Sequence, residues 1–321
     1  MYGLSGCRTV NWRFLGGWLA IALTLAGCDT STTEAPVEDE RPDVVTTSTM
    51  ITDWTARVAG EAIDLTGILE PGADPHVYEP VPQDSIAFEE AELVFYNGYD
   101  LEPNLIRLMN GAGIDARKVA VGEVISPLDT DYEGSTVPDP HVWGDVENVV
   151  TMVGVIQEEL SALVPEQGAT FEANAADFIA ELEALDQWIA EQIATIPAEQ
   201  RKLVTTHDAF EYYTTAYGLE SAGTLIGIST EEQPSAQTVQ QLADTIQSLG
   251  VPAIFAETTI NPRLITTVAE EAGVTLAPTE LYSDSIGAPG SEGATYIDMM
   301  VSNTRAIVES LGGTSTPFTP E

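Results

Sequence analysis

Cysteine, histidine and positive charge are all scarce in this sequence of 321 residues. It contains two cysteines and three histidines, and its 51 acidic residues stand against 11 basic ones. The formal net charge of −40 disfavours binding to nucleic acid and electrostatic docking on anionic lipid, so neither is expected as a partner. Hydrophobic residues make up 44% of the chain, which is enough for packed cores and excludes a disordered polyanion.

The sequence also lacks the short motifs of several common enzyme classes. We find no GxxxxGK[ST] phosphate loop, no GxGxxG after a strand, no HExxH and no GxSxG nucleophile elbow. The motifs that supply phosphate binding, dinucleotide binding, zinc proteolysis or serine catalysis are therefore missing. The protein is not expected to be an enzyme.

The first 27 residues are predicted to be a signal peptide. Arg8 and Arg13 precede an apolar run from Phe14 to Gly27, whose 14 residues are too few to span a membrane comfortably. The run leads into Leu25-Ala26-Gly27-Cys28, which resembles the lipobox of bacterial lipoproteins. That resemblance implies lipid attachment at Cys28, the first mature residue. An ordinary signal peptide with a chance cysteine is the alternative.

No free thiol then remains in the mature chain. Cys7 lies in the removed segment and Cys28 carries the lipid, which excludes disulfides, thiol nucleophiles and thiolate metal sites. Residues 28–42 are rich in Thr, Glu and Pro and are predicted to form a flexible tether between the lipid and the folded part. A similar flexible tail is expected at residues 312–321.

Between these ends, segments typical of strands alternate with segments typical of helices, which predicts an α/β fold. The longest helical pattern covers residues 166–197, with Pro165 before it and Pro197 at its end. We expect two α/β lobes, each a mainly parallel sheet with flanking helices, joined by this one long rigid helix. The N-terminal lobe is predicted at residues 43–165 and the C-terminal lobe at residues 198–311.

All three histidines lie in segments where one predicted element gives way to the next. His76 and His141 each occur in the sequence Asp-Pro-His-Val, and His207 directly follows the strand predicted at residues 202–206. Proline stiffens the backbone next to the first two imidazoles. An aspartate near each histidine could orient the second ring nitrogen, as carboxylates do around metal sites; these are Asp74, Asp139 and Asp208. The long spacings match no short metal motif, so histidines without a special partner remain the alternative.

Several ordered motifs together resemble one family, the metal-binding lipoproteins of bacterial ABC importers (cluster A-I, or family 9, solute-binding proteins). The similarity covers about residues 43–311, and the lipobox and the long central helix are also typical of the family. The motifs responsible for the similarity are Glu70-Pro-Gly-Ala-Asp-Pro-His-Val-Tyr-Glu-Pro80, Asn97-Gly-Tyr-Asp-Leu-Glu102, Asp139-Pro-His-Val-Trp143, Leu203-Val-Thr-Thr-His-Asp-Ala-Phe210, Phe255-Ala-Glu-Thr258 and Leu281-Tyr-Ser-Asp-Ser-Ile-Gly287.

This resemblance implies four metal ligands, namely His76, His141, His207 and Asp284. Three imidazoles and one carboxylate suit a borderline divalent ion. Family members that bind manganese often carry glutamate where this chain has His207, which favours Zn²⁺ as the transported ligand. Another branch with three histidines and an aspartate includes manganese transporters, so Mn²⁺ is a close second.

The predicted function is that of a monomeric, extracytoplasmic receptor, periplasmic or on the cell surface and lipid-anchored to the bacterial membrane. It would capture the ion in the cleft between the lobes and deliver it to an ABC permease with a cytoplasmic ATPase. Two alternatives remain. One is a secreted zinc-dependent hydrolase, and the other is a surface adhesion protein without a transport role.

Overall fold

The computed structural model describes residues 41–111, 115–132 and 134–320, all within one compact unit that begins at Arg41. The predicted signal peptide, Cys28 and nearly all of the predicted tether lie outside the described residues. Within the described part of the chain, no helix is both long and apolar enough to cross a membrane.

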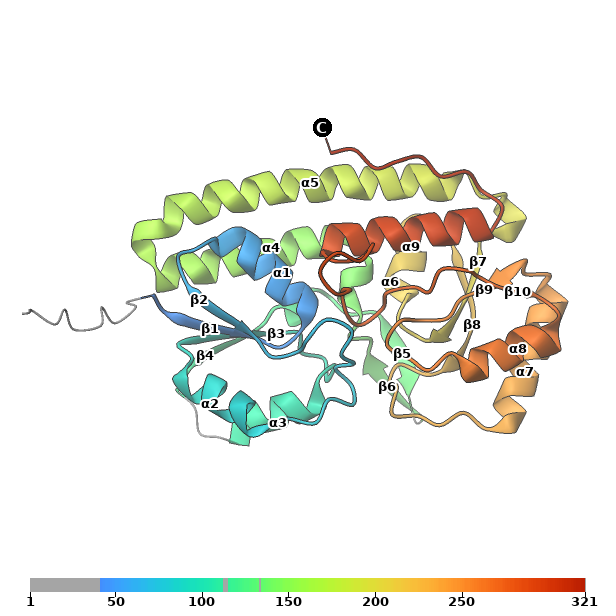
Figure 1. The fold of residues 1–321 in the computed structure, drawn as a ribbon, viewed down its shortest axis with the longest axis horizontal. Coiled ribbons are helices and arrows are strands. Elements are labelled where there is room, and N and C mark those ends of the chain that lie inside the picture. The colour runs from blue at the N-terminus through green and yellow to red at the C-terminus, as the bar shows by residue number, and fades with distance from the viewer. Residues whose placement is uncertain (1–40, 112–114, 133, 321) are drawn as a thin grey trace, which may run out of the picture. The chain divides into compact units, whose positions relative to one another are not determined.

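The first half of the fold is built on a four-stranded parallel sheet in the order β2-β1-β3-β4. Helix α1 lies on one side of this sheet, and α2 and α3 lie on the other (Figure 1). Buried apolar residues such as Val44 and Val94 of the central strands contact these layers. The elements are β1 (Asp43–Thr46), α1 (Thr49–Ala59), β2 (Asp64–Gly67), α2 (Pro82–Glu90), β3 (Leu93–Tyr96), α3 (Pro103–Gly111) and β4 (Arg117–Ala120).

The second half contains two short parallel pairs, β7 with β8 and β9 with β10. The amide of Phe255 donates to the carbonyl of Val204 at 2.9 Å, which connects the end of β9 to β7. An antiparallel hairpin and α4 precede this half. The elements are β5 (Asp129–Tyr132), β6 (Ser135–Pro138), α4 (Val146–Leu163), β7 (Lys202–His207), α6 (Glu211–Tyr217), β8 (Glu220–Ile226), α7 (Ala236–Leu249), β9 (Ala253–Ile254), α8 (Arg263–Ala272) and β10 (Thr275–Leu276).

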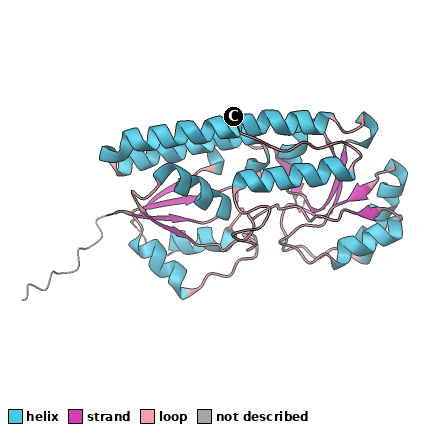
Figure 2. Ribbon diagram, turned by 45° about the horizontal axis from the view of Figure 1, so that its top comes forward, coloured by secondary structure: helices cyan, strands magenta, loops and turns pink. Residues whose placement is uncertain are grey.

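Helix α5 (Gly168–Ala194) joins the two halves. Its 27 residues extend about 40 Å, so it reaches over both sets of strands (Figures 1 and 2). It contacts α1 and α4 on one side, and α6 and α9 (Tyr296–Ser310) on the other. The α/β class, the parallel sheets and the long linking helix that the sequence predicts are confirmed.

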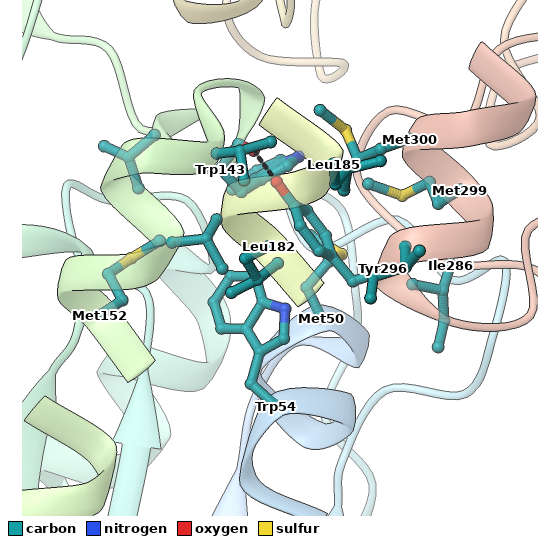
Figure 3. Packing of buried hydrophobic residues seen from close by; sticks show 14 of the residues in the cluster. Met50, Trp54, Trp143, Met152, Leu182, Leu185, Ile286, Tyr296, Met299 and Met300 are labelled. Carbon is teal, nitrogen blue, oxygen red and sulfur yellow. Dashed lines mark hydrogen bonds between the residues drawn. The ribbon is translucent and has the colours of Figure 1, made fainter. Parts of the chain in front are cut away.

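One hydrophobic cluster runs through both halves beneath α5. Trp54 of α1 meets Tyr296 of α9 edge to face, with ring centroids 5.4 Å apart. The Tyr296 hydroxyl donates to the carbonyl of Trp143 at 2.8 Å (Figure 3). The last helix therefore packs against the first one. The lobe boundaries at residues 165 and 198 remain predictions, because this core does not stop at either of them.

The C-terminal segment differs from the flexible tail that the sequence predicts. Residues 312–320 lie along α5, where Phe318 packs edge to face on Trp188 with centroids 5.6 Å apart. The amide of Thr316 donates to the side-chain oxygen of Gln192 at 2.8 Å, and the Trp188 indole donates to the Thr316 carbonyl at 3.2 Å. The polar composition of the segment suggested that its conformational entropy would keep it flexible. The packing of Phe318 and the hydrogen bonds to α5 offset the cost of ordering it.

Candidate metal centre

The two Asp-Pro-His-Val segments form the same local turn. The amide of His76 donates to Oδ1 of Asp74 at 2.9 Å, and the amide of His141 donates to Oδ1 of Asp139 at 2.9 Å. An aspartate that accepts from the amide two residues later closes an Asx turn. His76 follows β2, and His141 lies between β6 and the short 3₁₀ turn that leads into α4. Each turn therefore presents its imidazole from a fixed backbone.

The other two predicted ligands come from the second half of the fold. His207 is the last residue of β7, and ligand sites gather at the carboxyl ends of parallel strands. Asp284 lies three residues beyond Leu281, which forms a parallel bridge with Glu257. His76 is 3% exposed and the other three side chains are fully buried, so both halves contribute to one water-excluded cluster.

The fold brings all four predicted ligands together. One donor atom from each lies within 4.8 Å of the others. Nε2 of His76 is 3.3 Å from Nε2 of His141, which is 3.5 Å from Oδ1 of Asp284. Nε2 of His207 is 3.2 Å from Oδ2 of Asp284. Four donors placed tetrahedrally at about 2.1 Å from a zinc ion would lie about 3.4 Å apart. The separations here are of that size, although the two histidines approach different oxygens of Asp284.

The inner atoms of this cluster also lack protein partners. Within the described part of the chain, Nε2 of His207 and both carboxylate oxygens of Asp284 are buried without a hydrogen bond. Buried polar atoms without partners are rare and costly in native proteins. A cation at the centre would satisfy all three atoms at once, so the residues present fit a bound metal ion.

Two buried carboxylates contact Nδ1 of two predicted ligand histidines, the ring nitrogen that does not face the other ligands. Oδ1 of Asp139 is 2.7 Å from Nδ1 of His141, and the carboxylate of Glu257 pairs with Nδ1 of His207. A carboxylate at Nδ1 keeps the proton there and leaves the Nε2 lone pair for a metal. Asp74 instead binds the backbone amide of His76 and the hydroxyl of Thr230.

Glu257 is the participant that the sequence analysis missed. It accepts hydrogen bonds from the amides of Thr206 and His207 at 2.8 and 2.9 Å, in addition to its contact with the imidazole. Asp208, predicted for this role from its position in the chain, is not the carboxylate paired with His207. The motif Phe255-Ala-Glu-Thr258 was the available signal, since it carries Glu257.

Burial and charge shift the pKa values in this cluster in different directions. Burial lowers the pKa of His76 to about 3, against the attraction of Asp284. For His207 burial acts in the same direction, but the negative charges of Asp284 and Glu257 outweigh it and raise the pKa well above the ordinary value. Burial opposes ionisation of Asp284, yet the three neighbouring histidines lower its pKa. The charges of Asp284 and Glu257 therefore favour a proton on Nε2 of His207, and a metal ion at the centre would take the place of that proton while Nδ1 stays paired with Glu257.

The family model described as "Zinc-uptake complex component A periplasmic" (ZnuA) matches residues 44–310. The chain belongs to the ZnuA family. This agrees with the resemblance to metal-binding lipoproteins of ABC importers that the sequence motifs carry. ZnuA-type proteins are solute-binding components rather than enzymes, and the function class predicted from the sequence is confirmed: a metal-binding receptor of an ABC importer.

Individual relatives match over nearly their whole length. The manganese-binding lipoprotein MntA of Halalkalibacterium halodurans is 36% identical over 293 residues, 91% of this chain and 96% of the relative. The manganese ABC transporter substrate-binding lipoprotein PsaA of Streptococcus pneumoniae is 32% identical over 298 residues, 90% of this chain and 95% of the relative. The periplasmic zinc-binding protein TroA of Treponema pallidum superposes with a TM-score of 0.79 at 33% identity, covering 84% of this chain and 99% of TroA.

Proposed function

We propose that this ZnuA-family protein captures one divalent ion, Zn²⁺ or Mn²⁺, with His76, His141, His207 and Asp284 as its ligands. The observation that carries the proposal is a buried cluster of donor atoms from both halves of the fold, in which Nε2 of His207 and both oxygens of Asp284 have no hydrogen-bond partner. Three nitrogens and one carboxylate oxygen suit a borderline ion. The ion is the cargo, and the protein performs no covalent chemistry on it.

The ligand set favours zinc at equilibrium. Affinities of nitrogen and oxygen sites rise from Mn²⁺ toward Zn²⁺ along the Irving–Williams order, and three of the four donors here are nitrogens. The relatives named for manganese support Mn²⁺ as the second cargo of the same four ligands. We expect tighter binding of Zn²⁺ than of Mn²⁺, with each ion displacing the other.

The delivery partner in this proposal is an ABC permease with a cytoplasmic ATPase. The names of the relatives, which include substrate-binding lipoproteins of ABC transporters, support this partner and an extracytoplasmic, lipid-anchored location through Cys28. A zinc hydrolase is less well supported, because catalytic zinc keeps one position open for water. Here the carboxylate of Asp284 would occupy that fourth position as a protein ligand.

Metal content and affinity test the proposal directly. The mature protein is loaded competitively with Zn²⁺ and Mn²⁺, and bound metal is counted by elemental analysis. We expect one ion per chain, and a loss of at least 100-fold in zinc affinity when His76→Ala and His207→Ala are combined. The matched control combines Glu89→Ala with Glu172→Ala, two exposed acidic residues. Less than one ion per chain, or equal affinity in both double variants, would refute the assignment.

A further inference from the structure

A cavity of about 650 Å³ reaches the cluster at His76. Among the described residues that line it, His76 is the one member of the four-ligand cluster. Its wall is contributed by the first half of the fold at Tyr99 and Pro140, and by the second half at Ile228 and Ser229. An ion in this cavity would therefore meet the imidazole of His76 before the other ligands.

The segment Gly227–Glu232, which follows β8, forms the second-half wall of this cavity. Its hydrogen bonds to its own half are local: the amide of Gly227 donates to Oε2 of Glu232 at 3.1 Å, and the amide of Glu232 donates to the carbonyl of Ser229 at 3.3 Å. The carbonyl of Gly227 accepts from the amide of Asp208 at 3.3 Å. These bonds shape the segment as a compact turn on the end of β8.

A hydrogen bond from Thr230 connects this turn to the opposite wall. Oγ1 of Thr230 donates to Oδ2 of Asp74 at 2.6 Å, across 156 residues of sequence. The other oxygen of the same carboxylate, Oδ1, accepts the amide of His76. Asp74 thus links the cavity wall to the backbone of a ligand. The short distance is typical of a hydroxyl that donates to an ionised carboxylate.

We propose that Gly227–Glu232 is a gate over the His76 side of the metal site, and that Thr230 latches it to Asp74. This inference rests on the proposed function, because it assigns the route by which the cargo enters and leaves. Thr230 is a positioning residue here: it does not touch the ion, but it holds the wall closed against the loop that carries His76. Breaking the latch would let the turn move away on β8 and widen the cavity in front of His76.

The test compares two substitutions at one position. Thr230→Val keeps the shape and removes the hydroxyl, whereas Thr230→Ser keeps the hydroxyl. Zn²⁺ dissociation is followed by stopped flow after a chelator is added to the loaded full chain. Loss of one hydrogen bond to a charged group should accelerate dissociation by about tenfold in Thr230→Val, and Thr230→Ser should restore the wild-type rate. Thr266→Val, which removes a hydroxyl bound only to the Pro262 carbonyl of its own helix N-terminus, is the control.

A second readout uses the metal-free protein. Amide hydrogen exchange in residues 227–232 should become faster in Thr230→Val than in Thr230→Ser, while exchange in α5 stays unchanged. A dissociation rate in Thr230→Val within twofold of the wild type, or an equal acceleration in Thr230→Ser, would overturn the gate. If the wild type binds zinc but Thr230→Val releases it at the same rate as the Thr266→Val control, the gate proposal fails and the metal-receptor proposal stands. If the wild type binds no metal, both proposals fall.

Discussion

Glu257→Gln is the substitution that most directly probes how the protein prepares its metal site. The carboxylate of Glu257 accepts from two backbone amides and pairs with Nδ1 of His207. Glutamine has the same shape, and its single oxygen can keep the bonds to the amides. Its NH₂ group then faces Nδ1 of His207. Because an NH₂ group can only donate, the imidazole must move its proton from Nδ1 to Nε2 to accept this hydrogen bond.

That change of tautomer places a proton on the atom that would bind the ion. Metal binding must then remove this proton from Nε2 or return it to Nδ1, where the N–H group would face the NH₂ group of the glutamine. Loss of such an outer carboxylate costs 10- to 100-fold in metal affinity, or about 1.4–2.7 kcal/mol. Both side chains are fully buried, so water cannot replace the missing acceptor and the upper half of this range is expected.

The assay is a competition titration of Zn²⁺ against a chelator of known affinity. Glu102→Gln is the matched control, because Glu102 is also buried and accepts from the hydroxyl of Thr47 and the amide of Asn97, neither of which is a predicted ligand. Zinc affinity should fall in Glu257→Gln and stay within threefold of the wild type in Glu102→Gln. Equal affinities in both variants would show that Glu257 does not orient His207, and the reasoning would be refuted.

Three predictions concern stability. Burial raises the pKa of Glu102 from 4.5 to about 7, so the contribution of Glu102 to stability is full below pH 4.5 and is lost as the pH rises to 7. In urea unfolding, Glu102→Gln should therefore gain about 3 kcal/mol of stability relative to the wild type over that interval. The same pH dependence in both proteins would contradict this prediction. Tyr296→Phe leaves the buried carbonyl of Trp143 without its partner and should cost about 1–3 kcal/mol in the same assay; no change would mean that another donor replaces it. Phe318→Ala removes the ring packed on Trp188 and should cost about 1 kcal/mol, visible as a lower melting temperature, whereas an unchanged value would mean that the tail adds nothing.

Local patterns were enough to predict much of this fold. Apolar residues at helical spacing between Pro165 and Pro197 predicted α5, which the structure places at Gly168–Ala194. Asp145 caps α4 in the same local way, because its carboxylate accepts from the amide of Glu147 at 2.9 Å. Such features depend on residues a few positions apart, so the chain records them directly. The packed tail was not predicted, because its anchor on Trp188 lies 130 residues away in sequence.

The histidines could be singled out from the sequence because each lies in a segment between local elements or at the end of one, and a turn or a strand end is a local property. Asp284 was different: only the family resemblance pointed to it, and only the tertiary structure brings its oxygens beside His207. The motif Phe255-Ala-Glu-Thr258 contains Glu257, but only the tertiary structure pairs its carboxylate with His207. The hydrogen bond from Phe255 to Val204 aligns the end of β9 with β7 and so carries Glu257 to His207. The sequence determined which donors exist and how each is held locally, while the order of the strands decided which carboxylate lies behind which imidazole.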